Sequence, residues 1–435
     1  MNHSHSPPAA AEPQPAAEAD RQFAAFVGID WADEEHAVCV LDSVPDREKE
    51  RLRREVLPHT PEAIAAWAGG LARDFGDRPV AVMVEQSRGA LLQALMQYPQ
   101  LVLFPINPKQ AARYREALVH SGRKDDPTDA ECLARFVREH HRELRVWKPA
   151  DTLTRQLAQL VELRRKAVDS RKQTTQQAEA RLKQYFPLAL ELGDTALIVA
   201  VLERWPTHQT LARANPATLR KFFAQHGRRN ADQVNELIAR IRTAQPLTTD
   251  RAMIDPHALA VKFLVKELRL HEAAVAEFDA AIAQCFAAHP DAELFRSPPG
   301  AGAALAPRLL VAFGPDRGRF ASADEVQAYS GIAPITKRSG KSCHVTKRYF
   351  CNKFLRQTFH EFADHARKWS TWSKAFYEHL RARGHRHHAA VRSLAFKWIR
   401  ILFRCWKNRQ LYDEARYLRE LRAKGASYLP NLQST

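Results

Sequence analysis

The sequence lacks any apolar run long enough to cross a membrane. Its apolar stretches, such as Ala196 to Leu202, are far shorter than the roughly 20 residues that a transmembrane helix needs. Residues 1–21 are rich in Ala, Pro, Glu and Gln and contain neither an apolar core nor an early cluster of positive charge. They therefore resemble a disordered leader and not a signal peptide. We expect a soluble, cytoplasmic protein with no membrane partner.

Cysteine is also scarce. The six cysteines contain no C-x-x-C pair and are scattered along the chain, at positions 39, 132, 285, 343, 351 and 405. This pattern gives no disulfide framework and is typical of proteins in a reducing compartment. We expect free thiols.

Acidic residues are nearly absent from residues 331–410. This stretch contains 19 Lys and Arg against three acids, a net charge of +16, whereas the other 355 residues carry only about +1 of the total of +17. Tryptophans are interleaved with these cations, at positions 369, 372, 398 and 406. A soluble basic face would explain the charge alone. Its confinement to one region favours a surface that neutralises the phosphates of a nucleic acid.

Strand-like and helix-like segments alternate in residues 22–148. This alternation predicts an α/β domain with a largely parallel sheet. Because ligand chemistry in such sheets collects at the carboxyl ends of strands, Asp30 and Glu85, which follow two of the strands, are candidate site residues. The expected strands are 26–30, 36–41, 80–84 and 101–106, the first two forming a hairpin, and the expected helices are 60–75 and 91–96.

Residues 149–290 predict an α-helical domain with two long helices. Apolar side chains recur at roughly heptad spacing from Leu153 to Tyr185 and again from Val261 to Cys285, which indicates a coiled coil. The proline-containing stretch 205–257 is interpreted as shorter helices and loops at the tip. A hairpin within one chain and a dimerising coil share this pattern, and we favour a hairpin that also dimerises.

Residues 291–410 predict a mainly α-helical domain, followed by a tail, 411–435, that is helical at first. The turn Ser297–Gly302 leads into a helix expected from Ala303 to Phe313, and further helices are expected from about residues 323, 352 and 385. A glycine-containing turn before a helix can present backbone N–H groups to a phosphate, which makes Gly300 and Gly302 candidate nucleic-acid contacts. A plain helix start has the same pattern.

Two further carboxylates begin a predicted helix in the segment K-D-D-P-T-D-A, residues 124–130. Because proline is preferred at the first helical position, Asp126 is expected at the N-cap and Asp129 at the third helical position. Such a capping box stabilises a helix by itself. Together with Asp30 and Glu85, however, four converging acids would repel one another unless a cation neutralised them. Two Mg²⁺ ions about 4 Å apart would do so, activating the attacking oxygen and stabilising the leaving one.

The order of these motifs resembles the transposases and site-specific invertases that have a DEDD-type, RuvC-like catalytic domain, a family that includes Piv invertases and bridge-RNA-guided insertion-sequence recombinases. In the first half the resemblance rests on Gly28–Asp30, Val84–Glu85 and K-x-D-x-x-D-A at 124–130. In the second half it rests on P-G-A-G at 299–302, Arg319-Phe320, the segment 328–334, Ser339-Gly340 and Leu355-Arg356. The lysine-rich stretch 347–353 lacks the glycine that is usual in the family.

This resemblance implies an RNase H-like fold for residues 22–148, with Asp30, Glu85, Asp126 and Asp129 as the acidic tetrad. It also implies that Ser339 is a nucleophile that becomes covalently linked to DNA. Ser342 is the alternative nucleophile, and a phosphate-binding loop in which Ser339 only donates a hydrogen bond is the alternative role. The surrounding cations are candidate nucleic-acid contacts: Lys337, Arg338, Lys341, Lys347, Arg348, Lys353 and Arg356.

We therefore predict a DNA transposase or site-specific recombinase that acts on element ends and target DNA. Because strand exchange needs at least two active sites held together, we expect a homo-oligomer, a dimer or a tetramer. The resemblance adds a structured guide RNA as a partner and a bacterial-type, nucleoid-associated location. Two alternatives differ in their needs: a Mg²⁺-dependent structure-specific endonuclease would use the tetrad without Ser339, and a nucleic-acid-binding protein with a catalytically dead domain would use neither.

Overall fold

The computed structural model describes residues 22–42, 51–85, 89–118, 125–340, 342–349 and 351–429. The chain divides into two compact units, Met1–Pro149 and Ala150–Thr435. The predicted leader and two residues of the predicted motifs, Lys124 and Lys341, lie outside the described residues. Over the described ranges, no helix is both long and apolar enough to span a bilayer.

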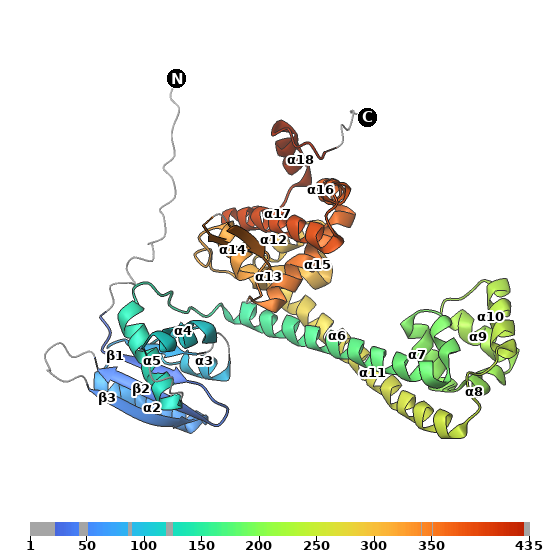
Figure 1. The fold of residues 1–435 in the computed structure, drawn as a ribbon, viewed down its shortest axis with the longest axis horizontal. Helices are drawn as coiled ribbons and strands as arrows, with labels where there is room; N and C mark the ends of the chain where they lie inside the picture. Colours follow the sequence, from blue (N-terminus) through green and yellow to red (C-terminus); the bar gives the residue numbers. More distant parts are fainter. Residues whose placement is uncertain are drawn as a thin grey trace. The chain divides into compact units, whose positions relative to one another are not determined.

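A mixed five-stranded sheet forms the centre of the first unit (Figure 1). Its strands are β1 (Ala25–Asp30), β2 (Glu35–Asp42), β3 (Leu52–Pro58), β4 (Val80–Val84) and β5 (Leu101–Pro105), in the order β3-β2-β1-β4-β5. The pairs β1–β4 and β4–β5 are parallel, whereas β1–β2 and β2–β3 are antiparallel. The prediction of a largely parallel sheet is therefore wrong for half of the pairings. It missed β3, a strand whose charged side chains hide the strand pattern.

Helices cover both faces of this sheet. The helices are α2 (Pro61–Phe75), α3 (Ala90–Leu95), α4 (Pro108–Leu118) and α5 (Asp126–His140). Alternate residues of the strands point to opposite faces, so Val27 packs in the core with α2 and α3 whereas Phe26 packs in the core with α5. Thr60 is the N-cap of α2, and its side chain accepts a hydrogen bond from the backbone N–H of Ala63. The α/β character predicted for this part of the chain is confirmed.

The second unit contains two long antiparallel helices, α6 (Thr152–Tyr185) and α11 (Arg251–Ala287), which pack side by side (Figure 1). Arg164 near the start of α6 pairs with Asp279 near the end of α11, and Thr174 further along α6 bonds Glu267. The pair is therefore a hairpin within one chain. Between the two helices in the chain lie η1 (Pro187–Glu191), α7 (Thr195–Arg204), α8 (His208–Ala212), α9 (Pro216–Gln225) and α10 (Ala231–Thr243). These helices share one core with the end of α6 and the first half of α11.

The remaining residues of the second unit are mainly helical, as predicted. They form α12 (Ala292–Arg296), α13 (Gly302–Phe313), α14 (Ala323–Tyr329), the hairpin β6 (Ile335–Ser339) and β7 (Ser342–Thr346), α15 (Lys353–Trp369), α16 (Thr371–Ala382), α17 (His387–Asn408) and α18 (Glu414–Ala423). Trp372, Trp398 and Trp406 are completely buried in their core, whereas Trp369 is 74% exposed. The three buried tryptophans therefore do not belong to a nucleic-acid surface, because they lie on the inner faces of amphipathic helices whose outer faces carry the interleaved cations.

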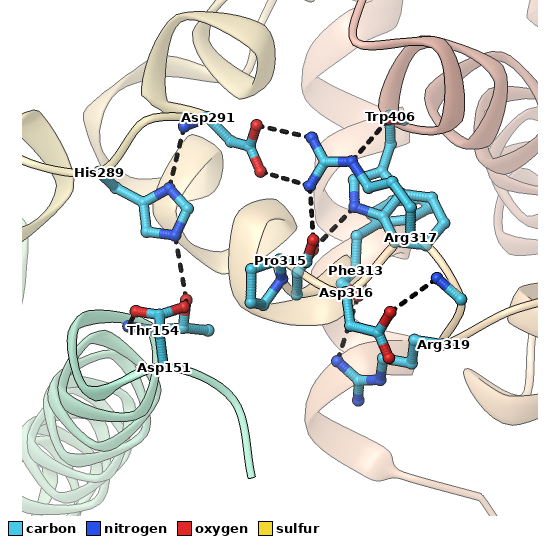
Figure 2. Close-up of polar contacts among 12 residues, drawn as sticks. Asp151, Thr154, His289, Asp291, Phe313, Pro315, Asp316, Arg317, Arg319 and Trp406 are labelled. Atoms are coloured by element: carbon cyan, nitrogen blue, oxygen red, sulfur yellow. Dashed lines mark hydrogen bonds and ion pairs between the residues drawn. The ribbon is translucent and has the colours of Figure 1, made fainter. Parts of the chain in front are cut away.

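A buried polar network joins the helical hairpin to this C-terminal body (Figure 2). The backbone N–H of Asp291 donates to Nδ1 of His289 at 3.0 Å, and Nε2 of the same ring contacts Oγ1 of Thr154 on α6, also at 3.0 Å. Burial lowers the pKa of His289, which favours the neutral ring that these contacts require. The Asp291 carboxylate in turn accepts two hydrogen bonds from Arg317, both 2.6 Å long, and Arg317 also donates to the carbonyl of Trp406 on α17.

Candidate active site

Two carboxylates follow adjacent parallel strands of the sheet. Asp30 is the last residue of β1 and Glu85 comes directly after β4. The strands are in register at Ile29 and Val84, and the backbone N–H of Glu85 donates to the carbonyl of Ile29 at 3.4 Å. The carboxyl ends of the two strands therefore bring the two acids to one edge of the sheet.

The first turn of α5 supplies the other two carboxylates. Its N-cap is Asp125, whose side chain accepts the Thr128 N–H at 2.8 Å, so the prediction that Asp126 is the cap is wrong by one residue. Pro127 occupies the second helical position, which is tolerated because the first backbone N–H groups of a helix have no partner within the helix. Asp125 therefore caps the helix, and neither Asp126 nor Asp129 is needed as a cap.

A close contact between α5 and β1 brings these acids to the sheet edge. A Cβ atom added to Gly28 would lie within 3.0 Å of the backbone of Ala130 and of Ala134, so only glycine allows the helix to approach this closely. Asp129, one residue before Ala130, is almost fully buried, whereas Asp126 is exposed. One pocket results, and the four predicted carboxylates line it together: Asp30, Glu85, Asp126 and Asp129.

Helix α4 adds a cation to this pocket that sequence reasoning did not identify. Nη1 of Arg115 lies 2.9 Å from Oδ1 and 2.7 Å from Oδ2 of Asp129, and these bonds raise the pKa of the guanidinium. The neighbouring Tyr114 donates to Glu139 at 2.6 Å, and burial raises the pKa of its phenol. Burial, together with Asp129, also raises the pKa of the Cys132 thiol, which favours its protonated form.

The donor chemistry of the pocket fits divalent cations. Carboxylate oxygens are the ligands that Mg²⁺ prefers. A buried carboxylate requires a positive partner, and the guanidinium of Arg115 is the partner that Asp129 has here. Within the described ranges, however, no three Asp, Glu, His or Cys side chains lie close enough to share one ion. The pocket therefore gathers suitable ligands without forming a closed coordination shell.

The second candidate region is the β6–β7 hairpin, in a part of the chain for which neither a strand nor a helix was predicted. Ser339 ends β6 and pairs with Ser342, the first residue of β7, and both are exposed. Gly340 between them has a φ of 55°, a conformation that suits glycine in a two-residue turn. The signal that was missed is the pair of strand-like runs separated by two residues. Lys341 and the side chain of Lys337 lie outside the described residues.

The other basic residues that were predicted to contact nucleic acid differ in their surroundings. Arg338, Lys347 and Lys353 are exposed, whereas Arg356 donates to the carbonyl of Arg348 at 3.2 Å and to Sγ of Cys351. Arg356 thus holds the chain between β7 and α15 in place.

Gly300 and Gly302, the two glycines that were predicted to contact nucleic acid, also differ in their surroundings. Gly300 has a φ of 80°, and an added Cβ would lie 2.9 Å from the backbone N of Ala366, so helix packing alone explains this glycine. An added Cβ on Gly302 would meet nothing within 4 Å.

Comparison with known proteins places these motifs in a family. Residues 27–187 match the DEDD-type IS110 transposase family, and residues 292–378 match the family described as transposases of IS116, IS110 and IS902. A mini-circle putative transposase for IS117 from Streptomyces coelicolor is 32% identical over 406 residues, which cover 90% of this chain and 96% of the relative. The 43.6 kDa protein of insertion element IS110 from the same species is 28% identical, with 82% of this chain and 88% of the relative covered.

A more distant relative agrees with these two. The 42 kDa protein of insertion element IS900 from Mycobacterium paratuberculosis is 24% identical, with 90% of this chain and 97% of the relative covered. The similarity therefore extends over both units and over nearly the full length of the relatives. The chain belongs to the IS110 family of DNA transposases, enzymes that cleave DNA and transfer its strands.

Proposed function

We propose that the pocket lined by Asp30, Glu85, Asp126 and Asp129 is the metal-dependent half of a transposase active site, and that Ser339 is the nucleophile of the other half. The observation that carries the first part is the convergence of four carboxylates from β1, β4 and α5 in one pocket. Divalent cations, Mg²⁺ above all, would neutralise charge on the phosphate and activate the attacking oxygen. The position of the acids at adjacent strand ends and on a facing helix supports the RNase H-like fold that the motifs imply.

Ser339 is suited to nucleophilic attack because it is exposed at the end of a hairpin. Its hydroxyl oxygen forms a bond to the phosphorus of the DNA backbone, the bond between phosphorus and a deoxyribose oxygen breaks, and the serine proton ends on the released deoxyribose hydroxyl. Attack by the hydroxyl of another strand then reverses these changes and rejoins the DNA. The exposed Arg338 beside Ser339 favours the charge that develops on the phosphate.

The second unit supplies the surface that binds nucleic acid. Most of its excess charge lies in residues 331–410, and Arg400, Arg404 and Lys407 are exposed on α17, whose apolar face is buried. These cations would contact phosphates and so bind DNA without reading its sequence. A structured guide RNA, as in the RNA-guided members that the motifs resemble, would supply sequence recognition by base pairing while the protein contacts the backbone.

Trapping of covalent protein–DNA adducts tests this proposal. With element-end DNA and Mg²⁺, the wild-type protein and Ser342→Ala should form an adduct that denaturants do not remove. Ser339→Ala should form none, since it lacks the attacking oxygen. Because Ser342 lies directly opposite Ser339 in the hairpin, Ser342→Ala is a closely matched control. An adduct that persists in Ser339→Ala but is lost in Ser342→Ala would transfer the role to Ser342.

The metal half of the proposal is tested in the same assay. Asp129→Asn and Glu85→Gln keep the size of the side chains and remove a charge, and each should abolish strand transfer. Wild-type levels of recombination by either variant would contradict the metal-site assignment. Metal-dependent cleavage that leaves no adduct in the wild-type protein would favour a structure-specific endonuclease, and no metal-dependent activity in the wild-type protein would favour a catalytically dead domain.

A further inference from the structure

We propose that Arg115 is an internal counter-ion of the carboxylate pocket, which must release Asp129 before a divalent cation can bind and thereby sets the metal affinity of the site. This inference rests on the proposed function of the pocket. It concerns the residue on α4 that neither the acidic motifs nor the serine hairpin includes.

The ion pair engages both oxygens of the carboxylate. A single nitrogen of Arg115 contacts both oxygens of Asp129, at 2.9 and 2.7 Å. The side chains are 23% and 9% exposed, so water screens the attraction only in part. Hydrogen bonds between ionised groups are among the strongest in proteins. A divalent cation that approaches Asp129 therefore competes with the guanidinium for the negative charge of this carboxylate.

The setting of this pair distinguishes it from the other ion pairs of α5. Glu131, on the same helix, pairs with Arg54 and Arg135 but does not line the pocket. Among the described residues that line the pocket, Arg115 is the one basic side chain, and it faces four carboxylates. One positive charge neutralises such a set incompletely, so the pocket favours exchange of the guanidinium for a divalent ion.

The open arrangement of the acids agrees with this exchange. No three potential ligands lie within reach of one ion in the described part of the chain, and the acid that sits deepest, Asp129, is the one held by Arg115. Release of Asp129 would free both of its oxygens for coordination. The freed guanidinium would remain beside the pocket, where a DNA phosphate offers it a replacement partner of the same charge.

The test is the affinity for Mn²⁺, measured by calorimetry on the full-length protein without DNA. Losing the competing charged hydrogen bonds should tighten Mn²⁺ binding in Arg115→Gln by about tenfold or more. Arg113→Gln is the matched control, because Arg113 is exposed on the same helix and does not line the pocket, and its affinity should equal that of the wild type. An unchanged or weaker affinity in folded Arg115→Gln overturns the inference.

A second variant removes the charge in another way. Arg115→Met keeps a long side chain but has neither a charge nor a hydrogen-bond donor, so it should also bind Mn²⁺ more tightly than the wild type, and it decides the question if Arg115→Gln fails to fold. Affinity in folded Arg115→Met equal to or below that of the wild type overturns the inference. Asp129→Asn distinguishes the two proposals. If Mn²⁺ binding is lost in Asp129→Asn but is unchanged in the Arg115 variants, only this inference is overturned. If neither the wild-type protein nor any Arg115 variant binds Mn²⁺, the metal site itself is overturned.

Discussion

Gly28 determines how closely helix α5 can approach the sheet. Its neighbours across the contact are backbone atoms of Ala130 and Ala134, which cannot move aside as a flexible side chain can. Asp126 and Asp129 belong to the first turn of the same helix. A residue without any chemistry of its own therefore positions two of the four carboxylates.

Gly28→Ala should destabilise the first unit and displace α5. The added methyl group overlaps backbone atoms, and overpacking of this kind costs about 1–3 kcal/mol or more in free energy of unfolding. Chemical denaturation followed by circular dichroism measures this cost. Gly70→Ala is the control: Gly70 lies inside α2, an added Cβ would meet only the end of the Arg73 side chain at 3.8 Å, and the change should stabilise by about 0.5–1 kcal/mol. Equal stability of Gly28→Ala and the wild type would contradict the packing described for α5.

Single residues also show which parts of the site the sequence could predict. Asp30 and Glu85 could be identified because each ends an apolar run, and strand ends meet at one edge of a parallel pair. Arg115 could not be identified, because it is one of several basic residues of a polar helix and its partner is 14 residues away. The cap was misplaced by one residue because proline is compatible with more than one position of the first helical turn.

At the scale of elements, prediction succeeded where apolar periodicity is long and failed where strands are polar. The helices α6 and α11 were located correctly because their apolar positions recur over many turns, although Pro256, expected at the tip, lies inside α11. The strands β3, β6 and β7 were missed because exposed strands need few apolar residues. The serine hairpin is thus the element of the candidate site that was hardest to predict.

The junction around Arg317 should contribute strongly to the stability of the second unit. Arg317 and Asp291 are 15% and 16% exposed, and the arginine also donates to the carbonyls of Pro315 and Trp406 (Figure 2). Arg317→Met leaves the carboxylate and two carbonyls without this donor, which should lower the free energy of unfolding by about 2 kcal/mol. Thermal and urea denaturation provide the measurement.

A control for this prediction lies on the neighbouring helix. Arg296 pairs with Glu293 on α12, and both side chains are more than half exposed. Arg296→Met should therefore change the free energy of unfolding by no more than about 0.5 kcal/mol. Comparable losses in the two variants would show that burial of the Arg317 pair contributes nothing beyond an exposed ion pair.

At the scale of the whole molecule, charge and chemistry are divided between the two units. The carboxylate pocket lies in the first unit, whereas the serine hairpin and the stretch with a net charge of +16 belong to the second. Strand exchange needs at least two such sets of residues held together, which is the reason for proposing a homo-oligomer. The long helix α11 offers a surface for that contact.

Three large apolar side chains on α11 are more than half exposed: Leu259 (57%), Phe263 (62%) and Leu270 (68%). Their spacing of four and seven residues places them on one side of the helix, away from the face packed on α6. Exposure of these apolar side chains to water is unfavourable in an isolated chain. The same surface of a second copy would cover them. We therefore expect the dimer contact to include this part of α11.

Replacing Phe263 and Leu270 by Glu in one variant should convert the proposed oligomer to a monomer without unfolding it, because both side chains are already exposed and the new charges repel their counterparts across the proposed contact. Sedimentation velocity gives the mass, and thermal denaturation verifies the fold. Leu247→Glu is the control, since Leu247 is 59% exposed but lies outside α11, and it should keep the wild-type mass. If the double variant also keeps that mass, this surface of α11 is not the contact. If it becomes monomeric yet still transfers strands, one copy suffices for the reaction, which would contradict the need for paired active sites.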